Sequence, residues 1–258
     1  MRKPLIATLL ALALLVMGTE AGAITYGQPD GNRHPNVGAL IWQRPSDNAF
    51  RILCSGTLID EDVFLTAAHC TAFLESQNVS NVWVSFDTQI PNAETANRTP
   101  ATYLTHPAFN PNTLRNDVAL VFLSSPQSQT PASIIAESDL SARKSDGTLK
   151  GQAFTAVGYG RTSEWQFGQP VQTFDGTRRF ATSPYLGLTQ NNLILLMTHN
   201  ATGAGGTCSG DSGGPRFLGD STVIASITSW GDPLCRSLDQ TQRIDIPAVH
   251  DFIEQYLD

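Results

Sequence analysis

Charged residues are scarce in this 258-residue chain, at 15% of the composition, and the basic residues are the rarer kind. The formal net charge is −7, and no run of lysine or arginine is longer than two residues. Nucleic acids and anionic membrane surfaces are bound through clustered positive charge. The composition therefore excludes both classes, and no nucleic-acid or membrane partner is expected.

Metal-ligand spacings and internal repeats are also missing. The five histidines and four cysteines form no cluster with the short spacings of a metal site, so no metal and no cofactor is expected. No segment repeats at a fixed period, which excludes a solenoid. Four histidines are interpreted as structural or surface residues: His34, His106, His199 and His250.

The chain has a single long apolar run, and it lies at the start. Met1–Pro4 is basic, Leu5–Gly18 is almost entirely apolar, and Ala21-Gly22-Ala23 has the small-x-small pattern of a cleavage site. The run is shorter than the roughly 18 to 20 residues that span a bilayer. It predicts a signal peptide over 1–23 and a secreted, extracellular protein, or a periplasmic one in a Gram-negative bacterium.

After this segment the chain alternates short β-rich runs with turns. The runs contain many β-branched and aromatic residues and are bounded by Gly, Pro, Asn or Asp. They are Val37–Trp42, Val82–Phe86, Val118–Phe122, Ala153–Val157, Leu193–Met197 and Val223–Ser229. Pro247–Leu257 differs, because its apolar residues recur at helical spacing. An all-β fold with one short C-terminal helix is predicted.

Three short motifs carry chemistry. They are Thr66-Ala67-Ala68-His69-Cys70, Asn116-Asp117-Val118-Ala119-Leu120 and Gly210-Asp211-Ser212-Gly213-Gly214-Pro215. A serine hydroxyl needs a base to take its proton as it attacks, and an imidazole oriented by a carboxylate does this. Each motif alone is also typical of a core histidine, a strand end or a turn. Together they predict nucleophilic catalysis.

The order His, Asp, Ser resembles that of the chymotrypsin-like (trypsin-fold) serine proteases. Gly158-Tyr159-Gly160 and Ser229-Trp230-Gly231 also stand where that family has them. The resemblance implies a serine endopeptidase in which Ser212 is the nucleophile, His69 the base and Asp117 the residue that orients the base.

The same resemblance implies a fold and an oxyanion hole. The fold is two packed six-stranded antiparallel Greek-key β-barrels within a domain over 24–258, one barrel at about 24–130 and the other at about 131–258. The oxyanion hole is formed by the backbone N–H groups of Gly210 and Ser212.

The four cysteines allow three pairings, and a secreted destination favours disulfides. The resemblance implies Cys54 with Cys70, beside the histidine, and Cys208 with Cys235, across the substrate pocket. Free cysteines in a reducing compartment are the alternative, which requires rejecting the signal peptide.

The residues after the predicted cleavage site, Ile24-Thr25-Tyr26-Gly27, resemble the Ile-Val-x-Gly terminus of activated family members. The resemblance implies that a free Ile24 α-amino group pairs with Asp211. No propeptide separates Ala23 from Ile24, so signal peptidase alone is expected to produce the active form.

Substrate selection is expected at a pocket for the P1 side chain. The lining residues implied by the resemblance are Gly206, Thr207, Ser229, Trp230, Gly231 and Asp239. Gly206 lies six residues before the serine, where trypsin-type members carry an aspartate, so a neutral pocket for apolar or aromatic side chains is predicted. As an alternative, Asp239 in the back wall would give broad or basic P1 specificity.

Protein or peptide substrates, protein protease inhibitors and a monomeric state are expected. Two alternative functions are a catalytically weak homologue that acts as a binding module and an esterase. The intact triad argues against the binding module. The lack of a third disulfide resembles bacterial secreted members. Asn78, Asn97 and Asn200 begin glycosylation sequons, which matter only in an organism that glycosylates secreted proteins.

Overall fold

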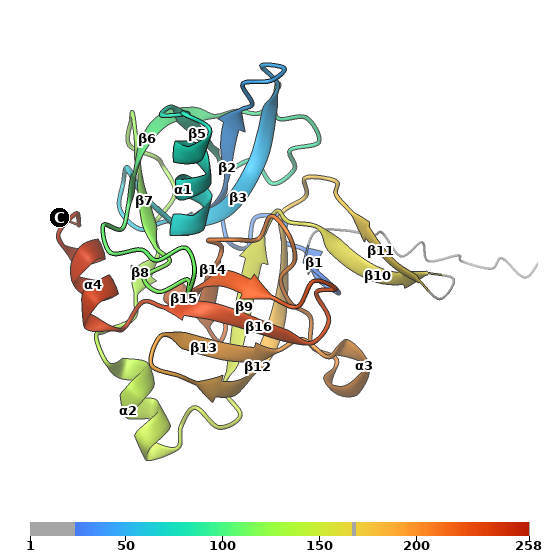
Figure 1. The fold of residues 1–258 in the computed structure, drawn as a ribbon. Coiled ribbons are helices and arrows are strands. Elements are labelled where there is room, and N and C mark those ends of the chain that lie inside the picture. The colour runs from blue at the N-terminus through green and yellow to red at the C-terminus, as the bar shows by residue number, and fades with distance from the viewer. Residues whose placement is uncertain (1–23, 167–168, 258) are drawn as a thin grey trace, which may run out of the picture.

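The structure, a computed structural model, describes residues 24–166 and 169–257. The predicted signal peptide lies outside these residues. The described chain forms two six-stranded antiparallel barrels, one above the other in Figure 1. The predicted fold class is therefore confirmed.

The N-terminal barrel closes in the strand order β2-β3-β4-β7-β6-β5. Its strands are β2 (Val37–Gln43), β3 (Phe50–Leu58), β4 (Val63–Thr66), β5 (Val82–Ser85), β6 (Thr99–Thr105) and β7 (Ala119–Leu123). Both faces of β2 and β4 are buried, which fits their nearly continuous apolar sequence. Helix α1 (Ala68–Ser76) follows β4 after a single residue.

The C-terminal barrel has the order β12-β13-β16-β15-β14-β9 and closes through the pairing of β9 with β12. Its strands are β9 (Ala153–Gly158), β12 (Arg179–Leu188), β13 (Asn192–Leu196), β14 (Pro215–Leu218), β15 (Val223–Gly231) and β16 (Leu238–Arg243). Each β-rich run that the sequence indicated overlaps one of the barrel strands.

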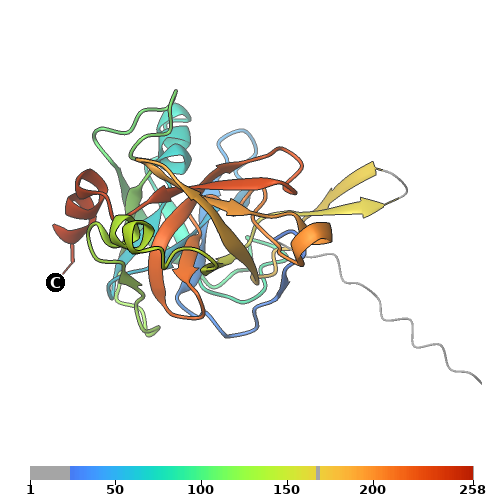
Figure 2. The same ribbon diagram turned by 90° about the horizontal axis from the view of Figure 1, so that it is seen from below.

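The smaller elements surround these barrels. They are β1 (Gln28–Pro29), β8 (Ser133–Ile134), α2 (Asp139–Asp146), α3 (His199–Thr202) and the hairpin of β10 (Thr162–Gln166) with β11 (Gln169–Thr173). The hairpin projects away from the barrels (Figure 2). Strand β1 pairs with β12, so the segment that leads into the N-terminal barrel is bound to the C-terminal barrel.

The predicted C-terminal helix is α4 (Pro247–Glu254). Its proline occupies the first turn, where the missing N–H costs nothing. Val249, Phe252 and Ile253 are buried, at the spacing of one helical face. The centroid of the Phe252 ring lies 4.6 Å from that of His106, which directly follows β6. Helix α4 therefore packs on the N-terminal barrel.

Candidate active site

The three catalytic candidates lie at the ends of barrel strands. His69 is in the first turn of α1, just after β4, and Asp117 precedes β7, which pairs with β4. Ser212 lies in the loop before β14 of the other barrel. Two antiparallel neighbours of one barrel thus bring the histidine and the aspartate together, and the serine comes from the second barrel.

His69 is held by Asp117 through two hydrogen bonds. The backbone N–H of His69 donates to Oδ1 and the imidazole Nδ1 to Oδ2, each at 2.8 Å. A carboxylate only accepts, so the Nδ1 atom carries the ring proton and the Nε2 atom keeps its lone pair. The imidazole is 29% exposed, whereas the Asp117 carboxylate is fully buried. The ring is therefore oriented as a base that a substrate can reach.

Two further residues form hydrogen bonds with Asp117, one with its carboxylate and one with its backbone N–H. Ser229 Oγ donates to Oδ2 at 2.5 Å, and the Asp117 backbone N–H donates to Gln242 Oε1 at 3.1 Å. Three donors thus bind this one buried carboxylate and fix its orientation. Ser229 was predicted at the substrate pocket, but no feature of the sequence pointed to Gln242, which β16 supplies from the other barrel.

The serine loop has the backbone that a cluster of glycines permits. Gly210 has a φ of +100°, where a side chain is disfavoured, and an added Cβ would lie 2.9 Å from the Cα of Gly160. Ser55 on β3 binds this loop twice: its N–H donates to Ser212 O at 2.9 Å and its Oγ to Gly210 O at 3.0 Å. Strand β3 therefore binds the serine loop through Ser55.

The donors of the expected oxyanion hole face no competing acceptor. In the part of the chain that the structure describes, no acceptor is bound to the backbone N–H groups of Gly210 and Ser212. The intervening Asp211 N–H is different, because it donates to Cys208 O at 3.0 Å. Ser212 is partly exposed. Its hydroxyl makes no hydrogen bond within the described residues, and such catalytic contacts often form only when substrate binds.

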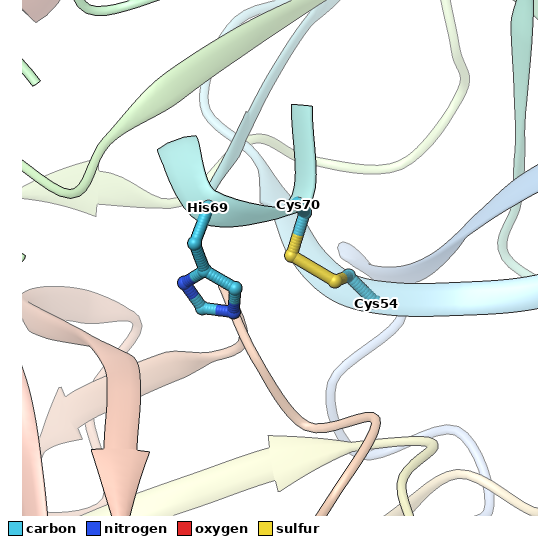
Figure 3. A group of neighbouring side chains, drawn as sticks. All are labelled: Cys54, His69 and Cys70. Carbon is cyan, nitrogen blue, oxygen red and sulfur yellow. A yellow bond between two sulfur atoms is a disulfide. The ribbon is translucent and has the colours of Figure 1, made fainter. Parts of the chain in front are cut away.

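Both expected disulfides are present, Cys54–Cys70 and Cys208–Cys235. In Figure 3 the first ties the helix that carries His69 to β3. His69, Cys54 and Cys70 lie close enough to resemble a metal-ligand group, but the two sulfurs are bonded to each other. Sulfur in a disulfide is not the thiolate that binds metals.

A cavity of about 170 Å³ adjoins the serine. Its lining residues are Thr207, Cys208, Ser209, Ser212, Thr228, Ser229, Trp230, Gly231, Asp232, Pro233 and Cys235. Four of the predicted pocket residues are among them. A larger cavity of about 660 Å³ lies between α3 and the segment 232–237, but none of the three catalytic candidates lines it. The smaller cavity is therefore the one that lies beside the catalytic candidates, where the P1 pocket was predicted.

Two residues predicted to line the pocket do not line it. Gly206 is bound through its backbone to Thr25, and an added Cβ would lie 2.1 Å from the sulfur of Met197. Asp239 is fully buried and forms an ion pair with Arg216. The carboxylate that was expected to receive a basic substrate is thus already paired within the protein. These expectations are corrected because packing fills the one position and an internal cation occupies the other.

Sequence reasoning missed Arg216 and Met197. Arg216 carries a signal that could have been used, because it is a single charge in the apolar strand Pro215-Arg216-Phe217-Leu218 directly after the serine motif. A charge in a buried strand requires a partner. Met197 ends a predicted strand and carries no such signal.

Asp211 is fully buried and accepts two backbone hydrogen bonds, from Gly160 at 2.7 Å and from Cys208 at 2.9 Å. Burial raises the pKa of its carboxyl to about 7, although both hydrogen bonds and the charge of Arg216 act in the opposite direction. In the uncut chain the Ile24 nitrogen belongs to a peptide bond, so it is no ammonium partner. The Ile24 side chain is buried against Ala156 and Ala181.

The two barrels, with a histidine–aspartate pair from one and a glycine-flanked serine from the other, define a chymotrypsin-like serine protease. Comparison with known proteins agrees. The family model described as Trypsin matches residues 27–253. The chain belongs to the trypsin family, and it is a serine endopeptidase.

Its relatives include trypsins and a kallikrein-related peptidase from different organisms. A trypsin of Phaedon cochleariae is 28% identical, over 85% of this chain and 87% of its own. Kallikrein 1-related peptidase b24 of Mus musculus is 27% identical, over 88% of each chain. A trypsin of the bacterium Saccharopolyspora erythraea is 28% identical, over 79% of this chain and 84% of its own.

Solved structures share the fold. HL collagenase aligns with a TM-score of 0.68 at 19% identity, over 90% of this chain and 97% of its own. Human heparin binding protein aligns with a TM-score of 0.66 at 19% identity, over 90% and 96%. Among the described residues, no helix has both the length and the apolar character needed to cross a bilayer.

Proposed function

We propose that the chain is a secreted endopeptidase that cleaves peptide bonds through an acyl-enzyme on Ser212. The observation that carries this proposal is the His69 imidazole, whose Nδ1 proton is fixed by Asp117 at 2.8 Å. This leaves the Nε2 atom as a base on an imidazole that is 29% exposed. The unbound N–H groups of Gly210 and Ser212 supply the oxyanion donors.

The proposed reaction has two halves. Ser212 Oγ attacks the peptide carbonyl while its proton passes to His69 Nε2, and the tetrahedral oxyanion is bound by the two backbone N–H groups. The imidazolium then gives its proton to the leaving amine, and the C–N bond breaks. Water next attacks the acyl ester, His69 takes the proton of this water, and the proton returns to Ser212 as the ester breaks.

A neutral P1 side chain fits the pocket best. The charged residue that lines the cavity is Asp232, and its carboxylate is held within its own loop by the backbone N–H groups of Leu234 at 2.8 Å and Arg236 at 2.9 Å. A buried cation without a partner is costly. Peptides with Phe, Tyr, Leu or Met at P1 are therefore expected to be cleaved faster than those with Arg or Lys.

Secretion and the mature N-terminus belong to the same proposal. The leader over 1–23 is expected to be removed after Ala23, and the new Ile24 ammonium then pairs with Asp211. The burial of the Ile24 side chain supports this, as does a buried carboxyl whose pKa of about 7 has room to fall once a cation arrives. N-terminal sequencing of secreted protein should begin Ile-Thr-Tyr-Gly.

The second candidate function is a binding module without activity. One structural neighbour is called heparin binding protein, and heparin is a polyanion. A chain with a net charge of −7 repels a polyanion. Loss of the leader removes Arg2, Lys3 and Glu20, which changes the charge to −8. The oriented histidine favours catalysis over this alternative.

The test is active-site labelling combined with cleavage of a peptide library. Phenylmethylsulfonyl fluoride should label Ser212, and mass spectrometry of the library should report peptide products with neutral residues at P1. Ser212→Ala should lose both labelling and cleavage, while Ser128→Ala, an exposed serine between the barrels, should keep both. Retained peptidase activity in Ser212→Ala, or in His69→Ala, would contradict the proposal.

A further inference from the structure

Arg216 is a fully buried cation behind the P1 pocket. It lies on β14, four residues after Ser212, and pairs with the equally buried Asp239 on β16. Thr207 joins the two: its hydroxyl donates to Asp239 Oδ2 at 2.8 Å and accepts from Arg216 Nη2 at 3.2 Å. Because Thr207 also lines the pocket, one hydroxyl separates the substrate cavity from the ion pair.

The register of the sheet places Asp239 directly behind the pocket. Asp239 pairs with Gly231 across β15 and β16, and Gly231 lines the cavity. Because Gly231 has no side chain, the residue opposite it in the ladder lies close to the cavity wall. Asp239 is thus a carboxylate at the back of the pocket, as the sequence suggested, but its charge is directed to Arg216.

Stability alone does not account for this ion pair. Arg216 Nε and Nη1 and Asp239 Oδ1 have no hydrogen-bond partner among the described residues. A buried ion pair with unsatisfied polar atoms contributes little to stability, and apolar residues of similar size often stabilise a core as well or better. The location of the pair beside the pocket suggests a role in substrate selection.

We propose that Arg216 is a specificity-determining residue that acts as the internal counter-ion of Asp239. Its guanidinium supplies, from behind the pocket wall, the positive charge that Asp239 would otherwise draw from a P1 arginine or lysine, and this keeps the back of the pocket neutral. The inference rests on the proposed function, because it concerns the P1 pocket of the Ser212 protease. It assigns the neutral P1 preference to an aspartate whose charge is balanced by Arg216.

The charge state of Arg216 supports this role. Burial lowers the pKa of its guanidinium to about 9, and the nearby Asp211 carboxylate opposes that fall. The value lies above neutral pH, so the guanidinium is charged at pH 7. Removal of Arg216 would leave Asp239 as an unbalanced negative charge behind Thr207, and a basic P1 side chain would be the cation best placed to balance it.

The direct test is Arg216→Met, which keeps the length of the side chain and removes the charge. The ratio of kcat/KM for Arg or Lys at P1 to that for Phe at P1 should rise at least tenfold over the wild type. Benzamidine, a small cationic probe, should inhibit this variant more strongly. The double variant Arg216→Met/Asp239→Asn should return both readings to the wild-type range, and Arg216→Lys, which keeps the cation, should retain the neutral preference.

Asp239→Asn is the opposite test and also serves if Arg216→Met does not fold. It leaves the guanidinium unbalanced, so cleavage after Glu or Asp should rise relative to Phe, and cleavage after Arg or Lys should fall. A purely structural ion pair would change the unfolding temperature of these variants but not these ratios. Unchanged ratios in either folded variant would overturn the inference.

The wild type gives a decisive reading without any variant. Cleavage after neutral residues with no benzamidine inhibition supports the inference, whereas a wild type that prefers Arg or Lys overturns it, because Asp239 would then be open to substrate. Labelling of Ser212 with a fluorophosphonate is read on every protein. If the folded wild type is not labelled, the proposed function itself fails; if it is labelled and the ratios do not move, only the role of Arg216 fails.

Discussion

The three buried aspartates of the site have three different kinds of partner. Asp117 accepts hydrogen bonds from His69 and from a serine hydroxyl, and the first of these orients the imidazole. Asp211 has only backbone donors in the uncut chain, and burial raises its pKa. Asp239 is paired with Arg216. The same side chain thus has three different environments in one site: an imidazole and a hydroxyl, backbone N–H groups, and a guanidinium.

The hydrogen bond from Ser229 to Asp117 can be tested separately from the triad. Ser229→Ala removes a 2.5 Å donor to a buried carboxylate, and hydrogen bonds to charged groups are worth about 1.5–3 kcal/mol. We expect kcat/KM on a peptide substrate to fall about tenfold. Asp117→Asn should cost far more, about 10⁴-fold, because the imidazole then loses its correct tautomer. Equal losses in the two variants would show that Ser229 is part of the essential machinery.

Gly210 tests the oxyanion hole. Gly210→Ala forces a Cβ to within 2.9 Å of the Cα of Gly160 and should displace the Gly210 N–H, so kcat should fall about 10²–10³-fold. Gly147→Ala is the matched control, since Gly147 has a φ of +83° with nothing near the added Cβ. The Gly147→Ala variant has the same unfavourable positive φ without a steric clash, so it should leave kcat unchanged. Steady-state kinetics decide, and a fall of kcat in both variants would point to strain alone.

At the scale of elements, the site is built from loops at strand ends, and each disulfide fixes one of them. Cys54–Cys70 joins β3 to the start of α1, and Cys208–Cys235 joins the serine loop to the segment between β15 and β16. The loops they close are of similar length, with sequence separations of 16 and 27 residues. They therefore constrain the unfolded chain to a similar extent but act on different parts of the site.

Removal of each disulfide should separate stability from function. Replacement of either cysteine pair by alanines should lower the free energy of unfolding by about 3 kcal/mol, by the chain-entropy argument. In the Cys54/Cys70 variant we expect mainly a lower kcat, because the helix that carries His69 is released. In the Cys208/Cys235 variant we expect mainly a higher KM. Urea unfolding and steady-state kinetics measure the two effects. Identical kinetic changes in both variants would contradict this division.

At the scale of the whole molecule, each end of the chain crosses to the other barrel. Strand β1 pairs with β12, and α4 packs on the N-terminal barrel. The buried Arg178 strengthens the first crossing, because its Nε donates to Asp30 Oδ2 at 2.9 Å and its Nη1 to Val37 O on β2 at 2.9 Å. The two barrels, whose loops carry the catalytic candidates, are thus connected by segments that are distant in sequence.

Asp211 makes the stability of the uncut chain depend on pH. Burial raises its pKa from 3.8 to about 7, so the native state holds the proton more tightly than the unfolded state. The contribution of Asp211 to the free energy of unfolding should be greatest below about pH 4 and fall as pH rises from 4 through 7, with a slope of up to about 1.4 kcal/mol per pH unit. Urea unfolding of the full chain carrying Ser212→Ala, which prevents self-cleavage, measures this slope.

Two comparisons control that experiment. Asp211→Asn in the same background should lack this contribution to the slope. A chain that begins at Ile24 should lack it as well, because its ammonium would keep the carboxyl ionised. If the full chain and its Asp211→Asn variant show the same profile, the pH dependence arises from other groups.

Local sequence indicated six of the twelve barrel strands and the C-terminal helix. The β-rich runs and the C-terminal helix depend on residues within a few positions of one another, so their periodicity was readable without tertiary contacts. The same holds for the glycines around Ser212, whose conformations are local. The family resemblance of three short motifs then implied the two barrels and the cysteine pairs, which the structure contains.

Only the tertiary structure decided which groups face the substrate. Met197 packs where a side chain at position 206 would project, and Arg216 neutralises Asp239 from a strand two places away in the sheet. Gln242 reaches Asp117 from the opposite barrel. These contacts join residues that are far apart in the chain, and the strength of each interaction depends on how deeply the residues are buried. Local sequence cannot specify them, because a charge in an apolar strand shows that a partner is needed but not which residue supplies it.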